Sequence, residues 1–157
     1  MTNPTDLFSS ARRVGQLVWI ESQVFELTGR WSATTPEPAA RAFLTTASGH
    51  HGWHAELLST LLPSVAGGPP ADDFVAAAPA HLEELARLES ITDTAARLAG
   101  VWRGLVPAIA SAAEEHIAVS SGVADAASHR LLRLVIRDEM DDSAIAERLV
   151  AELAGLR

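Results

Sequence analysis

Residues 40–61 read ARAFLTTASGHHGWHAELLSTL, and this stretch decides the fold. Alternating steps of four and three residues mark one face of a helix, which carries Ala40, Leu44, Ala47, His51, His54, Leu58 and Leu61. Two histidines therefore occupy the middle of a face that is otherwise apolar. Burying an imidazolium or a carboxylate without a partner costs several kcal/mol, so a bundle tolerates such groups inside only when they pair or hold a metal. The pattern predicts a helix with a polar centre on its buried face.

The segments on either side repeat this arrangement. In residues 6–28 two alternative apolar faces, one through Val18 and the other through Leu17, both pass through Glu21. Glu21 is therefore expected at the centre of the inward face under either choice. In residues 93–121 the apolar face leads to His116, and its neighbours Glu114 and Glu115 point to the flanks.

The fourth long segment, residues 125–153, carries acidic residues in the same place. Its apolar face reads Leu131, Val135, Asp138, Asp142, Ile145 and Leu149, with Glu139 beside it. Four carboxylates within residues 138–142 cannot all point outward on a helix, so at least one is expected inside. The candidate metal ligands are thus Glu21, His51, His54, His116, Asp138, Glu139 and Asp142. The sequence leaves any catalytic residue undetermined.

These residue types limit the chemistry of the centre. The chain has no Cys, which excludes a thiolate zinc site, an iron–sulfur cluster, a disulfide framework and a cysteine nucleophile. A metal would have N and O ligands, and neutral imidazoles with carboxylates suit Fe, Mn or Zn. His50 is expected at the surface, whereas Trp19, Trp53 and Trp102 are expected to pack in the core.

The sequence predicts an all-α fold built as one domain over residues 1–157. Strand signals are nearly absent, and Gly and Pro fall at the edges of helical patterns. Four long helices are expected over residues 6–28, 37–62, 93–121 and 125–153, with Asp6 and Asp125 as N-caps and Gly29 ending the first helix. The connection over residues 63–92 contains a short helix over 79–88 and is much longer than the other two, which is typical of a bundle with one crossover. Pro107 is expected to kink the third helix.

Composition limits the partners. The net charge of −8 and the absence of a basic stripe exclude a phosphate-backbone partner, so no nucleic acid is expected. The first residues lack a secretory pattern and no stretch approaches ~18 apolar residues, which predicts a cytoplasmic protein with no membrane partner. All twelve basic residues are Arg, and Ala is abundant, as in proteins from GC-rich bacterial genomes. A homodimer stays open as the oligomeric state.

The segments resemble the ferritin-like superfamily, a four-helix bundle in which helix 1 gives a Glu, helix 2 a Glu-x-x-His, helix 3 a Glu and helix 4 a second Glu-x-x-His. The resemblance implies a carboxylate-bridged di-iron or di-manganese centre for oxygen-dependent oxidation or hydroxylation of a small molecule, or for iron storage. Glu21 and His54 match this motif by residue type, and Glu139 is a third match. His51 stands where the family has Glu, and Asp142 where it has the second His.

These departures put the full di-metal set in doubt. If the third and fourth helices run antiparallel and the chain turns at about Val123, Glu139 lies at the same depth in the bundle as Pro107, so the third helix offers no ligand there. The same comparison of the first two helices places His51 within about one helical turn of Glu21, near 6 Å. A mononuclear site is therefore one alternative. A metal-free bundle with a buried His–carboxylate network, of structural or small-molecule-binding function, is another.

A second resemblance concerns the DinB-like metal-dependent transferases and isomerases. Residues 50–58 (HHGWHAELL) are similar to their helix 2, which supplies one of three histidine ligands. Those proteins take the other two from a His-x-x-x-His on the last helix, and here residues 125–153 contain only His129. This reading therefore ranks below the ferritin-like one.

Overall fold

The computed structural model describes residues 6–155, and within this range the chain forms helices and no strand. The predicted all-α class is thus confirmed. The elements in chain order are α1 (Leu7–Thr34), α2 (Pro38–Ser59), the 3-10 helix η1 (Ala71–Phe74), α3 (Pro79–Glu89), α4 (Thr94–Ala99), the π-helical segment η2 (Gly100–Leu105), α5 (Val106–Val119) and α6 (Ala126–Gly155). The segment α4–η2–α5 is continuous and acts as a single long rod.

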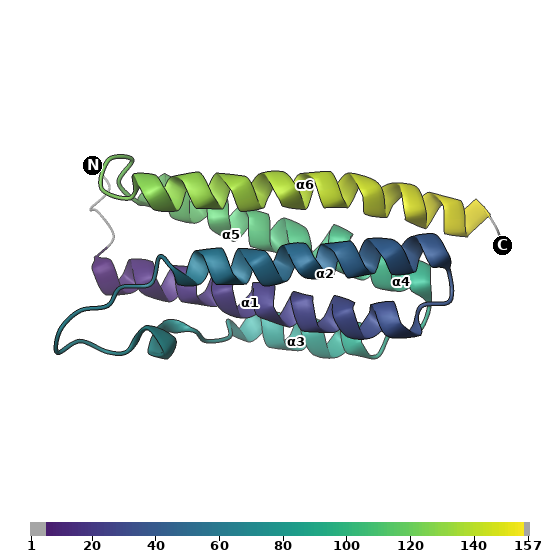
Figure 1. Cartoon of the computed structure of the whole chain (residues 1–157), viewed down its shortest axis with the longest axis horizontal. Coiled ribbons are helices and arrows are strands. Elements are labelled where there is room, and N and C mark those ends of the chain that lie inside the picture. Colours follow the sequence, from purple (N-terminus) through teal and green to yellow (C-terminus); the bar gives the residue numbers. More distant parts are fainter. Residues whose placement is uncertain (1–5, 156–157) are drawn as a thin grey trace.

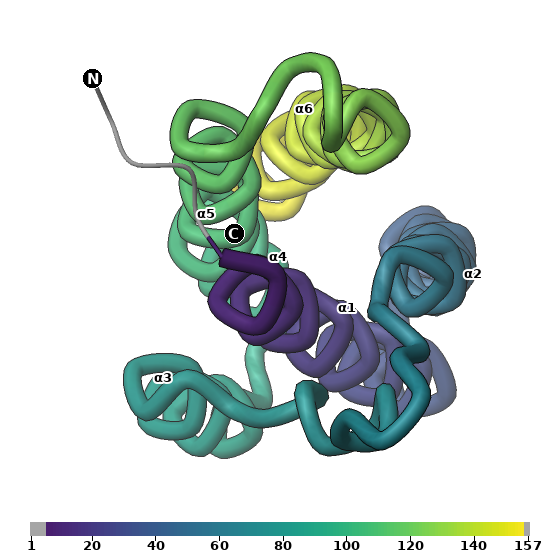
Figure 2. The backbone as a smooth tube through the Cα atoms, turned by 90° about the vertical axis from the view of Figure 1, so that its left-hand side faces the viewer, coloured from purple at the N-terminus to yellow at the C-terminus, as the bar shows by residue number. Residues whose placement is uncertain are grey.

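Four long rods lie side by side, namely α1, α2, α6 and α4–η2–α5 (Figure 1). α2 runs back along α1, and α6 runs back along α5. The chain leaves α2 at one end of the bundle and enters α4 at the other, so α3 carries it across the length of the molecule. Seen end-on, α3 lies outside the group of four (Figure 2), where it contacts η2. The expected long crossover with its short helix is present.

α1 begins as predicted but ends later. The Asp6 carboxylate accepts hydrogen bonds from the backbone N–H groups of Phe8 and Ser9, which caps the first turn. Gly29 does not end the helix, and this expectation was wrong. A Cβ at Gly29 would lie 3.1 Å from Ser48 Oγ of α2, so this glycine serves the close packing of two helices. The helix ends instead at Thr34, two residues before Pro36, where the chain must become extended.

The rod α4–η2–α5 carries the irregularity expected near Pro107, but in another form. The rod begins close to the expected residue 93, and Asp93 caps α4 by accepting from the N–H of Ala96. The irregular segment precedes the proline, where the N–H of Val106 donates to the carbonyl of Val101, a π-type spacing of five residues. Trp102 in this segment is buried, with its ring centroid 4.7 Å from that of Phe43 on α2. The π turn therefore directs an aromatic side chain into the core.

The core is continuous along the bundle. Its fully buried large apolar side chains come from every long rod and from α3, and they include Ile20, Leu27, Leu44, Leu58, Leu88, Leu98, Leu105, Ile109 and Leu132. Not all expected core aromatics belong to it, since Trp53 is 45% exposed. The inward face of α1 passes through Leu17 and Val24, whereas Phe25 on the alternative face is exposed.

Two helical glycines provide a matched test of this packing. A Cβ at Gly15 would come 1.9 Å from the carbonyl oxygen of Phe74, because η1 rests its backbone directly on α1, whereas a Cβ at Gly49 meets nothing within 4 Å. Gly15→Ala is expected to lower the free energy of unfolding by more than about 2 kcal/mol through forced displacement of η1, while Gly49→Ala should raise it by about 0.5–1 kcal/mol through helix propensity. Urea unfolding of both variants measures this. Equal effects would contradict the contact between η1 and α1.

Candidate metal centre

Four ionisable side chains from three helices converge in the middle of the bundle. Glu21 comes from α1, His51 and His54 from α2, and Glu139 from α6. Each is at most 1% exposed, and one ligand atom from each lies within 4.8 Å of the others. Among the described residues, this is the group whose donor types and spacing could hold a metal ion. The polar centre predicted from the helical faces is therefore present.

The helical faces explain how these residues meet. His51 and His54 stand three positions apart, so both project from the same side of α2. On α6 the buried positions are His129, Leu132, Val135, Glu139, Asp142 and Ala146. Val135 and Asp142 are buried as predicted, but Leu132, Glu139 and Ala146 are buried in place of Leu131, Asp138 and Ile145. Glu139 is consequently a buried carboxylate like Asp142, and Asp138, expected on the face itself, lies at its edge with a side chain 28% exposed.

The contacts centre on the Nδ1 atoms of the two histidines. His51 Nδ1 lies 2.6 Å from Glu21 Oε2 and 3.2 Å from Glu139 Oε1. His54 Nδ1 lies 3.6 Å from Glu21 Oε2 and 3.5 Å from Glu139 Oε1. Two imidazole nitrogens and two carboxylate oxygens thus enclose a common point.

These separations can be compared with those of a coordinated ion. Bonds of about 2.1 Å from N and O ligands place neighbouring ligand atoms about 3.0 Å apart in an octahedral shell and about 3.4 Å apart in a tetrahedral one. Three of the four separations, 3.2, 3.5 and 3.6 Å, match this scale. The fourth, at 2.6 Å between His51 and Glu21, is a hydrogen bond that would open by about half an ångström around an ion.

Several polar atoms at this centre have no hydrogen-bond partner among the described residues. They are Glu21 Oε1, His51 Nε2, His54 Nδ1, Glu139 Oε1 and Glu139 Oε2. Buried polar atoms are almost always satisfied, because leaving one unpaired costs about 1–3 kcal/mol. An ion bound between the histidines and carboxylates would use His54 Nδ1 and Glu139 Oε1. The residues present therefore fit an N/O-ligated cation.

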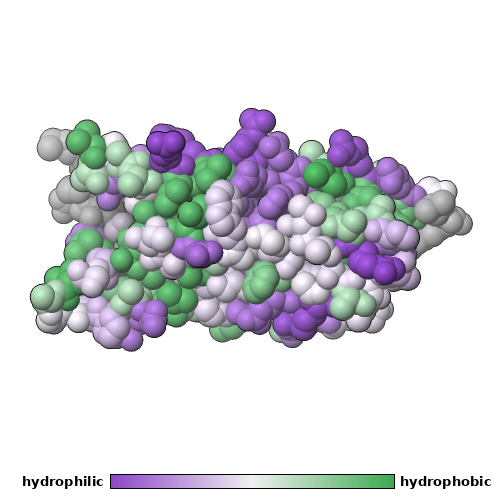
Figure 3. Space-filling model, viewed as in Figure 1, coloured by the Kyte–Doolittle hydropathy of each residue, from purple (hydrophilic) through white to green (hydrophobic). Residues whose placement is uncertain are grey.

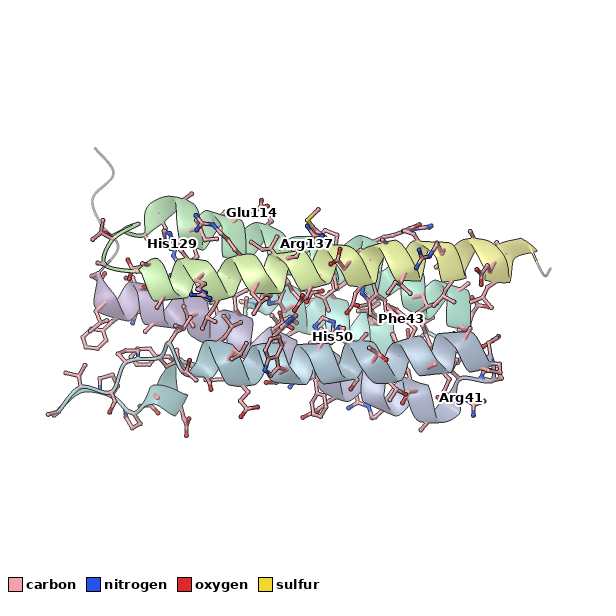
Figure 4. The ribbon with its side chains drawn as sticks, turned by 45° about the horizontal axis from the view of Figure 1, so that its top comes forward. Arg41, Phe43, His50, Glu114, His129 and Arg137 are labelled. Atoms are coloured by element: carbon pink, nitrogen blue, oxygen red, sulfur yellow. The ribbon has the colours of Figure 1, made fainter. Side chains whose placement is uncertain are left out.

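A second layer of His–carboxylate pairs flanks the centre between α2 and α6. His54 Nε2 lies 3.2 Å from Asp138 Oδ2, and His50 Nδ1 lies 2.8 Å from Asp142 Oδ2. His50 is found between the two helices (Figure 4), and its side chain is 41% exposed. His50 thus lies at the surface, as expected, but it is paired: Asp142 is its partner and is not a member of the central group. Hydrophilic side chains accordingly gather over the middle of α6 (Figure 3).

Sequence reasoning could have found His50. The same spacing of four positions separates residues 50 and 54 on α2 and residues 138 and 142 on α6. On antiparallel helices this spacing allows two His–carboxylate pairs, one helical turn apart. One pair is His54 with Asp138, and the other is His50 with Asp142. The sequence feature that could have predicted this pairing is the equal spacing of histidines in one segment and carboxylates in another. Helical periodicity examined one segment at a time does not reveal it.

His116 is buried as predicted but lies apart from the group. Its charged neighbours are Arg13, Asp125 and His129, near the junction of α5 and α6. Within residues 6–155 neither of its ring nitrogens has a hydrogen-bond partner. Burial, followed by the charge of Arg13, lowers the pKa of His116 and keeps the ring neutral. Glu114 and Glu115 are exposed. The rod α4–η2–α5 thus supplies no ligand to the centre, as the depth argument predicted.

Burial and mutual charge act in opposite directions on the protonation of this centre. Burial alone would raise the pKa of Glu21, but the charge and hydrogen bond of His51 outweigh it and hold that pKa below its usual value. For His54, burial would lower the pKa, but the neighbouring carboxylates of Glu139, Glu21 and Asp138 raise it to about 10. The pKa of His51 is also raised, against its burial, mainly by the charge of Glu21. Burial raises the pKa of Glu139, aided by the Glu21 charge.

Comparisons of the chain with protein-family models, with curated proteins and with solved structures gave no match. None of the described helices combines the length and apolar character needed to cross a membrane.

The metal-free protein is expected to be most stable at mildly acidic pH. The stabilisation from His54, whose pKa rises from 6.5 to about 10 on folding, is complete below 6.5 and is lost as pH rises toward 10. The stabilisation from Glu21, whose pKa falls below 4.5 on folding, is complete above 4.5 and is lost at lower pH. Urea unfolding in the presence of a chelator should therefore give a higher free energy of unfolding at about pH 5.5 than at about pH 8.5. The opposite order would mean that the histidines are neutral in the folded protein.

Proposed function

We propose that the protein binds one divalent transition metal ion, Fe(II) or Mn(II), on Glu21, His51, His54 and Glu139. The observation that carries this proposal is the convergence of two Nδ1 atoms and two carboxylate oxygens within 4.8 Å of one another in a fully buried site. Two neutral imidazoles and two carboxylates balance the charge of a dication, and this ligand set suits Fe and Mn. The single cluster favours a mononuclear centre over the di-metal alternative.

We further propose oxygen-dependent oxidation of a small molecule as the reaction class. Iron or manganese bound here would supply redox chemistry with dioxygen, as in the ferritin-like superfamily that the sequence pattern resembles. The chain's own residues would exclude water, since all four side chains are buried, and would hold the ligands in place. His54 also connects the centre to Asp138, the most exposed carboxylate that touches a ligand.

A metal-free bundle is the second candidate, and one observation favours it. The 2.6 Å hydrogen bond between His51 and Glu21 already pairs two members of the group without an ion. The unpartnered atoms of Glu139 and His54 weigh against it, because a purely structural network would be expected to satisfy them. The DinB-like alternative has less support, since the group contains two histidines and α6 contributes a glutamate.

Elemental analysis separates these candidates. Protein purified from iron- and manganese-replete medium is expected to contain close to one metal ion per chain, and titration of the metal-free protein with Fe(II), Mn(II) or Zn(II) should release protons from the histidines. Less than about a tenth of a metal ion per chain, with no binding on titration, would remove the metal-dependent function.

Substitutions of Glu21 test the centre itself. Glu21→Ala is expected to lower the free energy of unfolding by on the order of 3 kcal/mol, because it leaves buried histidine charges or a metal without their partner. Glu26→Ala, at an exposed position of the same helix, should cost under about 0.5 kcal/mol. Urea unfolding with and without added Fe(II) or Mn(II) measures both.

Glu21→Leu distinguishes a ligand from a structural partner. A structural network can often be replaced by apolar packing at little cost, whereas replacing a ligand abolishes the stabilisation that added metal provides. Metal-dependent stabilisation is therefore expected in the unmodified protein and absent in Glu21→Leu. If Glu21→Ala is as mild as Glu26→Ala, Glu21 has no charged partner in the core.

Asp138→Asn tests whether the outer carboxylate orients a ligand. Asp138 accepts from Nε2 of His54, which leaves Nδ1 of the same ring free to bind a metal. Loss of this charge is expected to weaken metal binding by about 10–100-fold without unfolding the protein. Asp141→Asn, three positions along α6 and paired only with the exposed Arg137, is the matched control and should leave affinity unchanged. Competition with a chelator gives both affinities, and equal values would deny Asp138 this role.

A further inference from the structure

A groove separate from the metal centre lies on the outer face of α1 and α2. Its volume is about 600 Å³, and it is lined by Ser22, Phe25, Glu26, Gly49, Gly52, Trp53, Ala55 and Glu56. Phe25 and Trp53 are each 45% exposed, which is unusual for large aromatic side chains that have a core available. Both side chains line the groove, and the Trp53 ring is tilted against that of His54, with the two ring centroids 5.9 Å apart.

Glycines of α2 shape this groove. The Phe25 ring lies against Gly52, where a Cβ would come 3.0 Å from its Cδ2 atom. At Gly49, one turn earlier, a Cβ would meet nothing within 4 Å. Two glycines in the interior of a helix lower its stability, and here only one of them is needed for packing. The space beside Gly49 is therefore left open by the sequence and not filled by another part of the described structure.

The charge on the groove is negative. Glu26 and Glu56 are the ionisable residues that line it. Glu26 lies 3.7 Å from Arg30, which itself makes a closer contact of 3.0 Å with Glu89. Glu56 forms no ion pair within the described residues, and the chain as a whole carries a net charge of −8. Half-exposed aromatic side chains beside the unpaired Glu56 carboxylate favour a cation, which is attracted by both the ring quadrupole and the negative charge.

We propose that this groove binds a small organic cation of the quaternary ammonium class, held between Trp53 and Phe25 and balanced by Glu56. A quaternary ammonium group has an apolar surface and a delocalised charge, so it matches aromatic walls with a carboxylate rim. A second copy of the chain fits less well, because a two-fold contact through this groove would bring two faces of the same negative charge together. The proposal does not depend on the metal centre.

The test uses choline and its neutral isostere 3,3-dimethylbutan-1-ol, in which carbon replaces the charged nitrogen. Each compound is titrated into the full-length protein as purified, and the indole resonances of tryptophan are followed by NMR. Choline is expected to shift the Trp53 resonance in a saturable manner, with an affinity about tenfold higher than that of the isostere. Equal affinities, or no saturable shift of Trp53 with choline, would overturn the proposal.

Three variants locate the site. Glu56→Gln should weaken choline binding and leave binding of the isostere unchanged, while Glu152→Gln at an exposed position of α6 should alter neither. Trp53→Leu should abolish the preference for choline. Gly49→Leu places a side chain in the open space, so it should block both compounds while keeping or raising the melting temperature. Choline binding that persists unchanged in Gly49→Leu or in Glu56→Gln would place the cation elsewhere and overturn the assignment.

Discussion

The buried contact between His51 and Glu21 is the interaction on which the rest of the structure depends. Taking an imidazolium and a carboxylate out of water costs several kcal/mol, and this is recovered only if the two groups meet at close range. At 2.6 Å the pair meets that condition, and it fixes the depth of α2 relative to α1. Glu139 lies at the same depth, with its Oε1 3.2 Å from Nδ1 of His51 and 3.5 Å from Nδ1 of His54. One ion pair thereby sets the register of three of the four rods.

The same charges explain why a metal and a pair of protons are alternative occupants of this centre. Two ionised carboxylates with two imidazolium rings sum to zero, and so do two ionised carboxylates with neutral rings and a dication. Exchange of two protons for one ion leaves the net charge of the buried centre unchanged, so neither state places an uncompensated charge in the core. The fourth rod contributes apolar side chains here, including Trp102, whose ring lies 6.5 Å from that of His51. The fourth rod therefore packs against the centre and supplies none of the four residues that would hold a metal.

Helical periodicity alone predicted much of the fold and part of the site. Apolar spacing placed Glu21, His51 and His54 inward, and loop lengths predicted the crossover, because these features are properties of single segments. What the sequence could not predict depends on contacts between segments. Gly29 has the sequence context of a helix end but serves the approach of Ser48, and Trp53, expected in the core, is 45% exposed. His50 acquires its role only from Asp142 on a distant helix.

The inward face on α6 differs from the predicted one by one position at three places. Leu132, Glu139 and Ala146 are buried where Leu131, Asp138 and Ile145 were expected, whereas Val135 and Asp142 belong to both sets. The shift is the same near both ends of the helix, so it is a choice between two adjacent faces and not an accumulated drift. The apolar residues of α6 allow both faces. The contacts with α2 decide between them. His50 and His54 pair with Asp142 and Asp138 at the outer side of the helix pair. Glu139 is then the carboxylate that faces His51. In a long helix the polar residues, read against those of the neighbouring helix, fix the inward face more reliably than the apolar residues do.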